Sequence, residues 1–219
     1  MAKCLRILLL ATLLWLTSVV WAAELMVCWG GEGDIPAVAL LEEGREPRVL
    51  LPGGASDGEM MVVCLEKLGM LQVDVMLMPT VSPFLRGAAK IAAKCDIRKL
   101  AVLYNSRSRG NWRELRKKLT ENGTAINEVY PKVNQYWRVF MGEWLVNYQR
   151  LKDAGTFRVS FFTNFADIGA PVYYFEQKVT GVFVVGRQDD PKPLLELPKS
   201  NRSGMKKVFL EGISSSSEK

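Results

Sequence analysis

Residues 48–78, RVLLPGGASDGEMMVVCLEKLGMLQVDVMLM, contain the pattern that decides the fold class. Short apolar runs of strand length occur at Arg48–Leu51 and Val73–Met78. Between them, over Ser56–Gly69, apolar residues recur at helical spacing, and Gly69 stands where a helix C-cap is expected. Because an apolar strand, an amphipathic helix and a second apolar strand follow one another directly, the stretch predicts an α/β layer architecture.

The same alternation continues on both sides of this stretch. Ser56 or Asp57 is expected to provide the N-cap of the central helix. Two short apolar strands precede it, at Leu25–Trp29 and Ala37–Leu41. The elements predicted after it are a helix at Leu85–Lys94, a strand at Lys99–Tyr104, a helix at Asn111–Asn122 and a strand at Ala125–Tyr130.

From about residue 134 the sequence becomes rich in aromatic and β-branched residues, which favour strands. Trp144–Leu151 and Thr156–Thr163 flank a four-residue loop that ends in Gly155, so a β-hairpin is predicted there. Five aromatic residues in this region could line a ligand-stacking strip or fill a sheet core, and strand spacing favours the core. These residues are Tyr136, Trp137, Phe140, Trp144 and Tyr148.

Residues 1–23 have the pattern of a secretory signal peptide. Lys3 and Arg6 precede an apolar run at residues 7–20, and small residues follow at the positions that a signal peptidase reads. An uncleaved membrane anchor is the alternative, because the run approaches the roughly 20 apolar residues that a spanning helix needs. The protein is therefore expected to be secreted or periplasmic, with no integral membrane span after signal cleavage.

The remaining chain is predicted to form one domain and a tail. The domain covers residues 24–187, with an α/β half at 24–133 and a β-rich half at 134–187. Residues 188–219 contain several prolines and a closing serine run, so they are expected to be a flexible, largely disordered tail.

Composition excludes several kinds of chemistry. The chain has 219 residues and no histidine, so it cannot build a His-ligated zinc site, a His general base or a Ser-His-Asp triad. Cys28, Cys64 and Cys95 occur in apolar contexts and are interpreted as small buried hydrophobic residues, at least in part. One disulfide with one free thiol is the alternative outside the cytoplasm. No cofactor is predicted.

Three motifs, in order, resemble a known family. Residues 29–34 read WGGEGD, residues 50–54 read LLPGG, and residues 65–78 contain a helix end followed by the strand VDVMLM. This succession is similar to that of the metallo-β-lactamase fold, in the ComEC-type branch associated with DNA uptake, where the first two motifs read DVGQGD and LIDGG. The resemblance implies an αββα two-sheet sandwich. Five residues of these motifs are expected to have a structural role in turns, namely Gly31, Gly33, Asp34, Gly53 and Gly54.

The family's metal-binding turn is not preserved. Family members carry T-H-x-H-x-D-H at this point, and those side chains hold the divalent ions that generate a hydroxide nucleophile. In this chain Thr80, Ser82, Phe84 and Leu85 stand at the ligand positions. A hydroxyl is a poor zinc ligand, and Phe and Leu are not ligands. The resemblance therefore implies a member that has lost its metal site, and no metal is predicted.

Basic residues concentrate in one segment. The chain has a net charge of +6, and Arg98–Lys118 alone contains eight basic residues against one acidic residue. Guanidinium groups beside an indole suit a phosphate backbone or an anionic membrane surface, whereas a solvated helix face that keeps the protein soluble is the alternative. The residues predicted to contact a polyanion are Arg107, Arg109, Trp112, Arg113, Arg116 and Lys117.

These observations favour an exported, non-catalytic protein that acts by binding. The expected partner is nucleic acid, another polyanion or an envelope protein. A periplasmic solute-binding protein is one alternative, although it would require a second α/β half instead of the β-rich stretch. A metal-independent hydrolase is another alternative, with Ser82 or Ser106 as nucleophile and a lysine base.

Overall fold

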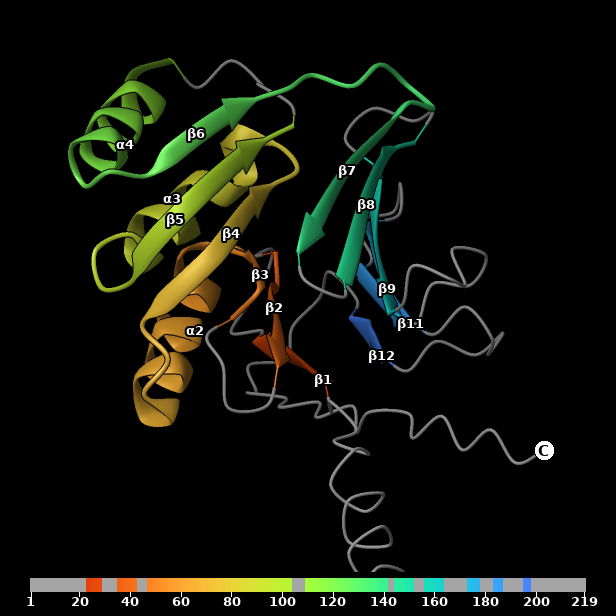
Figure 1. Cartoon of the computed structure of the whole chain (residues 1–219), viewed down its shortest axis with the longest axis horizontal. Helices are drawn as coiled ribbons and strands as arrows, with labels where there is room; N and C mark the ends of the chain where they lie inside the picture. The colour runs from red at the N-terminus through yellow and green to blue at the C-terminus, as the bar shows by residue number, and fades with distance from the viewer. Residues whose placement is uncertain are drawn as a thin grey trace, which may run out of the picture.

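In a computed structural model the chain folds into three layers (Figure 1). The structure describes residues 23–28, 35–42, 47–103, 109–141, 144–151, 156–163, 173–177, 183–186 and 195–197. Within these residues, three helices form one outer layer, a six-stranded mixed sheet forms the middle layer, and a six-stranded antiparallel sheet forms the other. The α/β fold class is confirmed. Within these residues no helix covers the outer face of the second sheet, and the αββα arrangement stays a prediction.

The first sheet has its strands in sequence order. Its first three strands, β1 (Ala23–Cys28), β2 (Ala37–Glu42) and β3 (Val49–Leu51), pair antiparallel. From β3 onward the pairing is parallel, through β4 (Gln72–Met78), β5 (Asp96–Val102) and β6 (Ala125–Glu128). Each parallel connection passes through a helix, and these are α2 (Ala55–Leu68), α3 (Val81–Ile91) and α4 (Arg109–Glu121).

The predicted helices are confirmed, with corrections at their starts. Gly69 is the C-cap of α2, in the left-handed conformation at φ 71°, as expected. The N-cap of α2 is Gly54 rather than Ser56 or Asp57, and Asp57 is fully buried in the first turn. Helix α3 begins at Val81, four residues before the predicted start. Pro83 lies in its first turn, where the N–H groups have no partner within the helix, so a proline is tolerated there.

The second sheet forms the β-rich half. Its strands, again in sequence order, are β7 (Tyr136–Met141), β8 (Trp144–Arg150), β9 (Phe157–Thr163), β10 (Tyr173–Gln177), β11 (Phe183–Gly186) and β12 (Leu195–Leu197). Arg150 pairs with Phe157, which confirms the predicted hairpin. Strand β12 pairs with β11, so the prediction of a flexible tail from residue 188 onward is wrong at residues 195–197.

An aromatic cluster joins helix α3 to the second sheet. Phe84 of α3 lies 5.9 Å from Phe157 of β9, and Phe157 also lies 5.9 Å from Phe175 of β10, measured between ring centres. Tyr148 of β8 stacks on Phe157, and its hydroxyl donates a hydrogen bond of 3.4 Å to the Pro79 carbonyl. All four rings are fully buried, so one hydrophobic core runs from the helices to the second sheet.

The turn after β3 is packed closely against the backbone at Ile35, just before β2. Gly53 has φ 66°, and a Cβ there would lie 2.6 Å from the Ile35 carbonyl oxygen. The Gly54 N–H donates a 2.7 Å hydrogen bond to the same oxygen. Gly53 therefore has the positive φ that favours glycine in a turn, whereas Gly54 is extended at φ −76°. Gly31, Gly33 and Asp34 lie outside the described residues.

Candidate functional site

The turn at the start of α3 holds the residues that stand at the family's metal-ligand positions. Thr80 is the N-cap residue of α3, and its side chain is buried. Phe84 and Leu85 are also buried, and Phe84 belongs to the aromatic cluster between the layers. The side chain of Ser82 lies outside the described residues. Packing against the second sheet therefore occupies the position where the resemblance would place a ligand.

Metal-binding side chains are sparse around this turn. Within the described residues, no three His, Cys, Asp or Glu side chains gather closely enough to hold a metal ion.

Among the helices that the structure describes, none is both long enough and apolar enough to cross a membrane.

Helix α4 carries the predicted basic surface. Its apolar residues Leu115 and Leu119 are buried, and Trp112, which precedes them by one turn, is only 6% exposed. Because positions three and four apart share a helix face, these three residues form the inward side. The prediction that the Trp112 indole contributes to the binding surface is wrong, since it packs into the core.

The outward side of α4 forms a basic hollow. Arg113, Arg116 and Lys117, together with Thr120 and Glu121, line an open depression of about 540 Å³. The structure thus brings together three of the predicted contact residues on one helix face. Arg107 and the side chain of Arg109 lie outside the described residues. We refer to Arg113, Arg116 and Lys117 as the α4 basic face.

Two members of the α4 basic face have acidic neighbours. Arg116 Nε lies 3.2 Å from Glu128 Oε1, an ion pair without hydrogen-bond alignment, and Glu128 also accepts a 2.6 Å hydrogen bond from the Tyr130 hydroxyl. Lys117 Nζ lies 3.8 Å from Glu121, with both side chains largely exposed, so that pair contributes little. For Arg113 no ion pair is found among the described residues, and its charge is the most available of the three.

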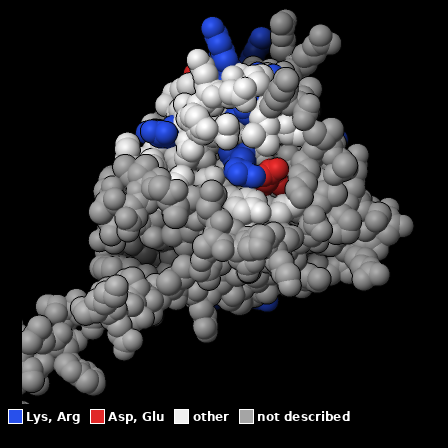
Figure 2. All heavy atoms as spheres, turned by 90° about the vertical axis from the view of Figure 1, so that its right-hand side faces the viewer, with Lys and Arg blue, Asp and Glu red and all other residues white. Residues whose placement is uncertain are grey.

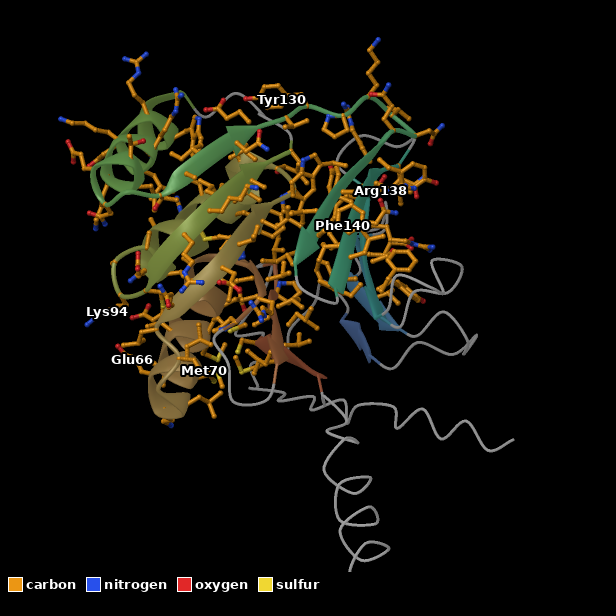
Figure 3. All side chains as sticks on the ribbon, in the orientation of Figure 1. Glu66, Met70, Lys94, Tyr130, Arg138 and Phe140 are labelled. Carbon is orange, nitrogen blue, oxygen red and sulfur yellow. The ribbon has the colours of Figure 1, made fainter. Side chains whose placement is uncertain are left out.

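Strand β7 presents a second exposed surface. Tyr136 and Phe140 are 53% and 58% exposed, and the guanidinium of Arg138, between them, lies 5.6 Å from the Tyr136 ring centre. Alternate residues of a strand share a face, so these three side chains point the same way, as Figure 3 shows for Arg138 and Phe140. We call Tyr136, Arg138 and Phe140 the β7 strip.

The β7 strip was not expected from the sequence. The core interpretation is confirmed for Tyr148, which is fully buried, and Trp137 packs against the core from the opposite face of β7. It is wrong for Tyr136 and Phe140, and the side chain of Trp144 lies outside the described residues. Figure 2 views the molecule from the side of the second sheet, where basic side chains are scattered over the described surface and an acidic group lies beside the basic side chain near the centre.

An ion pair and an aromatic contact also occupy the outer face of the second sheet. Arg158 donates hydrogen bonds from Nε and Nη2 to the Glu176 carboxylate, and its guanidinium lies 4.8 Å from the Tyr174 ring centre. Glu176 therefore neutralises Arg158, whereas no acidic partner of Arg138 is found among the described residues. The β7 strip is the part of this face that combines exposed rings with an available positive charge.

No protein-family model, curated protein or solved structure matches this chain. The resemblance to the metallo-β-lactamase fold therefore stays a prediction that rests on the sequence motifs.

Proposed function

We propose that the protein is an exported, non-catalytic binding protein of metallo-β-lactamase-like ancestry, and that it binds nucleic acid through the α4 basic face. One observation carries the proposal: Arg113, Arg116 and Lys117 line a single open hollow on a helix whose other side is buried. Two guanidinium groups and an ammonium group on one face suit a row of phosphates.

The β7 strip supports nucleic acid over a polyanion that lacks bases. Exposed aromatic rings bind unstacked bases, and base stacking contributes about 1–3 kcal/mol per base. Tyr136 and Phe140 provide two such rings, with Arg138 between them for a phosphate. A sulfated polysaccharide would use the charges but gain nothing from the rings. We therefore propose that the ligand is a single-stranded nucleic acid long enough to pass from α4, in the outer helix layer, to the outer face of the second sheet.

Two features support binding rather than turnover. The chain has no histidine, which removes the commonest general base and metal ligand. At the turn before α3, Phe84 is committed to packing against Phe157. Among the alternatives, a solute-binding protein fits less well because the second half is an antiparallel sheet and not a second α/β unit. A metal-independent hydrolase would need Ser106, which lies outside the described residues, or Ser82, whose side chain does as well.

The test is binding of the purified protein to single-stranded DNA and to heparin over a salt series. The α4 variant carries Arg113→Glu and Lys117→Glu, and leaves Arg116 in its ion pair. We expect it to bind DNA at least about tenfold more weakly, with a salt slope reduced by about two. The matched control carries Lys67→Glu and Lys94→Glu, which change the net charge equally at exposed positions away from α4 and should have a much smaller effect.

A third variant separates the two ligand classes. Tyr136→Ala with Phe140→Ala removes the rings of the β7 strip and leaves the α4 basic face intact. Weaker binding of DNA with unchanged binding of heparin is expected, because heparin has no bases to stack. Equal loss for both ligands would reject base stacking. No binding of either ligand at low salt would reject the proposed function and leave a protein partner as the next candidate.

A further inference from the structure

Two of the three described cysteines lie side by side in the core. Cys28 is the last residue of β1, and Cys64 lies in the last turns of α2. Their sulfur atoms are 4.0 Å apart, and both side chains are fully buried. The sequence left the pairing of Cys28, Cys64 and Cys95 open, and this distance singles out one pair.

Sheet topology excludes Cys95 as a disulfide partner of Cys28. Strands β1 and β5 run in the same direction, because β1 and β3 are both antiparallel to β2 and β3–β5 are parallel. Cys28 ends β1, whereas Cys95 directly precedes β5, so the two lie toward opposite ends of the sheet. Three strands also separate β1 from β5, which at about 4.8 Å per step gives a lateral distance of roughly 19 Å. A disulfide bridges Cα atoms no more than about 7 Å apart.

We propose that Cys28 and Cys64 form a disulfide in the native protein, and that Cys95 remains a thiol. The sulfurs must approach from 4.0 Å to about 2 Å, a shift within reach of side-chain rotation at two neighbouring residues. In the reaction one thiolate of the pair attacks a disulfide oxidant, which releases one thiol and leaves a mixed disulfide. The second thiolate then attacks the cysteine sulfur of the mixed disulfide and displaces the oxidant's remaining thiol. The two cysteines lose two electrons and two protons, and the oxidant is released as two thiols.

The cross-link would hold an exposed edge of the fold. Within the part of the chain that the structure describes, strand β1 lies at the edge of the first sheet, with β2 as its one neighbour. A bond to α2 attaches the end of this strand to the helix layer and closes a loop of 37 residues, counted from Cys28 to Cys64. Closing a loop of this size restricts the unfolded chain and so stabilises the folded one. The pair does not depend on the ligand, but the proposal rests on the export that is part of the proposed function, because disulfides persist in oxidising compartments.

The experiment is refolding of the full chain in a mixture of reduced and oxidised glutathione, followed by alkylation, digestion and mass spectrometry without reduction. We expect one linked peptide pair, containing Cys28 and Cys64, and an alkylated Cys95. The oxidised protein should melt roughly 8–15 °C above the protein kept in dithiothreitol. If the chain does not refold, the protein is made in an oxidising compartment and alkylated from the moment of lysis. Digestion and mass spectrometry then identify the linked peptides in the same way.

Single variants make the assignment specific. Cys28→Ser and Cys64→Ser should each abolish the linked peptide and the dependence of the melting temperature on dithiothreitol. The matched control, Cys95→Ser, should keep both. A linked peptide that contains Cys95 would overturn the proposal, and so would complete alkylation of Cys28 and Cys64 in protein refolded under oxidising conditions.

Discussion

Replacement of Gly87 by alanine tests how closely α3 packs on the turn after β3. An exposed glycine inside a helix normally costs about 0.5–1 kcal/mol relative to alanine, so local propensity predicts that Gly87→Ala stabilises the protein. The structure predicts the opposite. A Cβ at Gly87 would lie 2.3 Å from the carbonyl oxygens of Pro52 and Gly53 and 2.6 Å from that of Gly54.

The magnitude follows from what can move. All three oxygens are backbone atoms, and the turn that holds them is itself fixed, because the Gly54 N–H is hydrogen-bonded to the Ile35 carbonyl. On its other side Gly87 contacts α2, where a Cβ at Gly58 would lie 2.6 Å from the Gly87 Cα. Relief of the clash requires a shift of α3 as a unit. Overpacking of this kind costs about 1–3 kcal/mol, a figure that includes the backbone shift.

Urea and thermal unfolding, followed by circular dichroism, measure the difference. We expect Gly87→Ala to lower the free energy of unfolding by about 1–3 kcal/mol and the melting temperature by roughly 2–12 °C. The matched control is Gly110→Ala in α4, where a Cβ would meet nothing within 4 Å. It should raise the stability by at most about 1 kcal/mol. If Gly87→Ala is as stable as the unchanged protein, the close approach of α3 to the turn is refuted.

Three further changes test other contacts of the core and its rim. Asp74→Ala removes the carboxylate that pairs with Arg48 at 2.6 Å and with Arg98 at 2.8 Å. It should lower the free energy of unfolding in urea by about 2 kcal/mol, and a change near zero would show that water replaces the carboxylate. Phe84→Ala removes the ring by which α3 joins the aromatic cluster and should cost about 3–5 kcal/mol, so a loss below 1 kcal/mol would contradict the burial of this ring against Phe157. Tyr148→Phe removes the hydroxyl that donates a long 3.4 Å hydrogen bond and keeps the ring, so it should cost at most about 1.5 kcal/mol in the same assay. A larger loss would mean that the hydroxyl contributes more than this geometry indicates.

Much of the fold is predictable from the sequence because its signals are local. An apolar run of strand length or an apolar repeat at helical spacing lies within a single element, so the strands and helices of the first half were expected near their observed bounds. The inward face of α4 was predictable in the same way. Trp112, Leu115 and Leu119 follow the spacing of a buried helix stripe, and reading Trp112 as a surface residue overlooked that signal.

The candidate site was predictable only in part. The net charge of Arg98–Lys118 pointed to α4, and helical spacing placed Arg113, Arg116 and Lys117 together. The β7 strip was missed because the alternation of a strand separates two faces without saying which one is covered. The face of β7 that carries Trp137 is turned toward the first sheet, so Trp137 packs against the core. Tyr136 and Phe140 lie on the opposite face and are exposed.

The sequence by itself determined the order and type of the elements, the positive charge of α4 and the lack of histidine chemistry. These follow from residue types and from spacings of a few positions, which act along one element at a time. Only the tertiary structure decided that Phe84 meets Phe157, that Gly87 touches the turn at Gly53, and that Cys28 lies beside Cys64. Such contacts join residues that are far apart in the chain, and they depend on the stacking order of strands and layers, which no local spacing specifies.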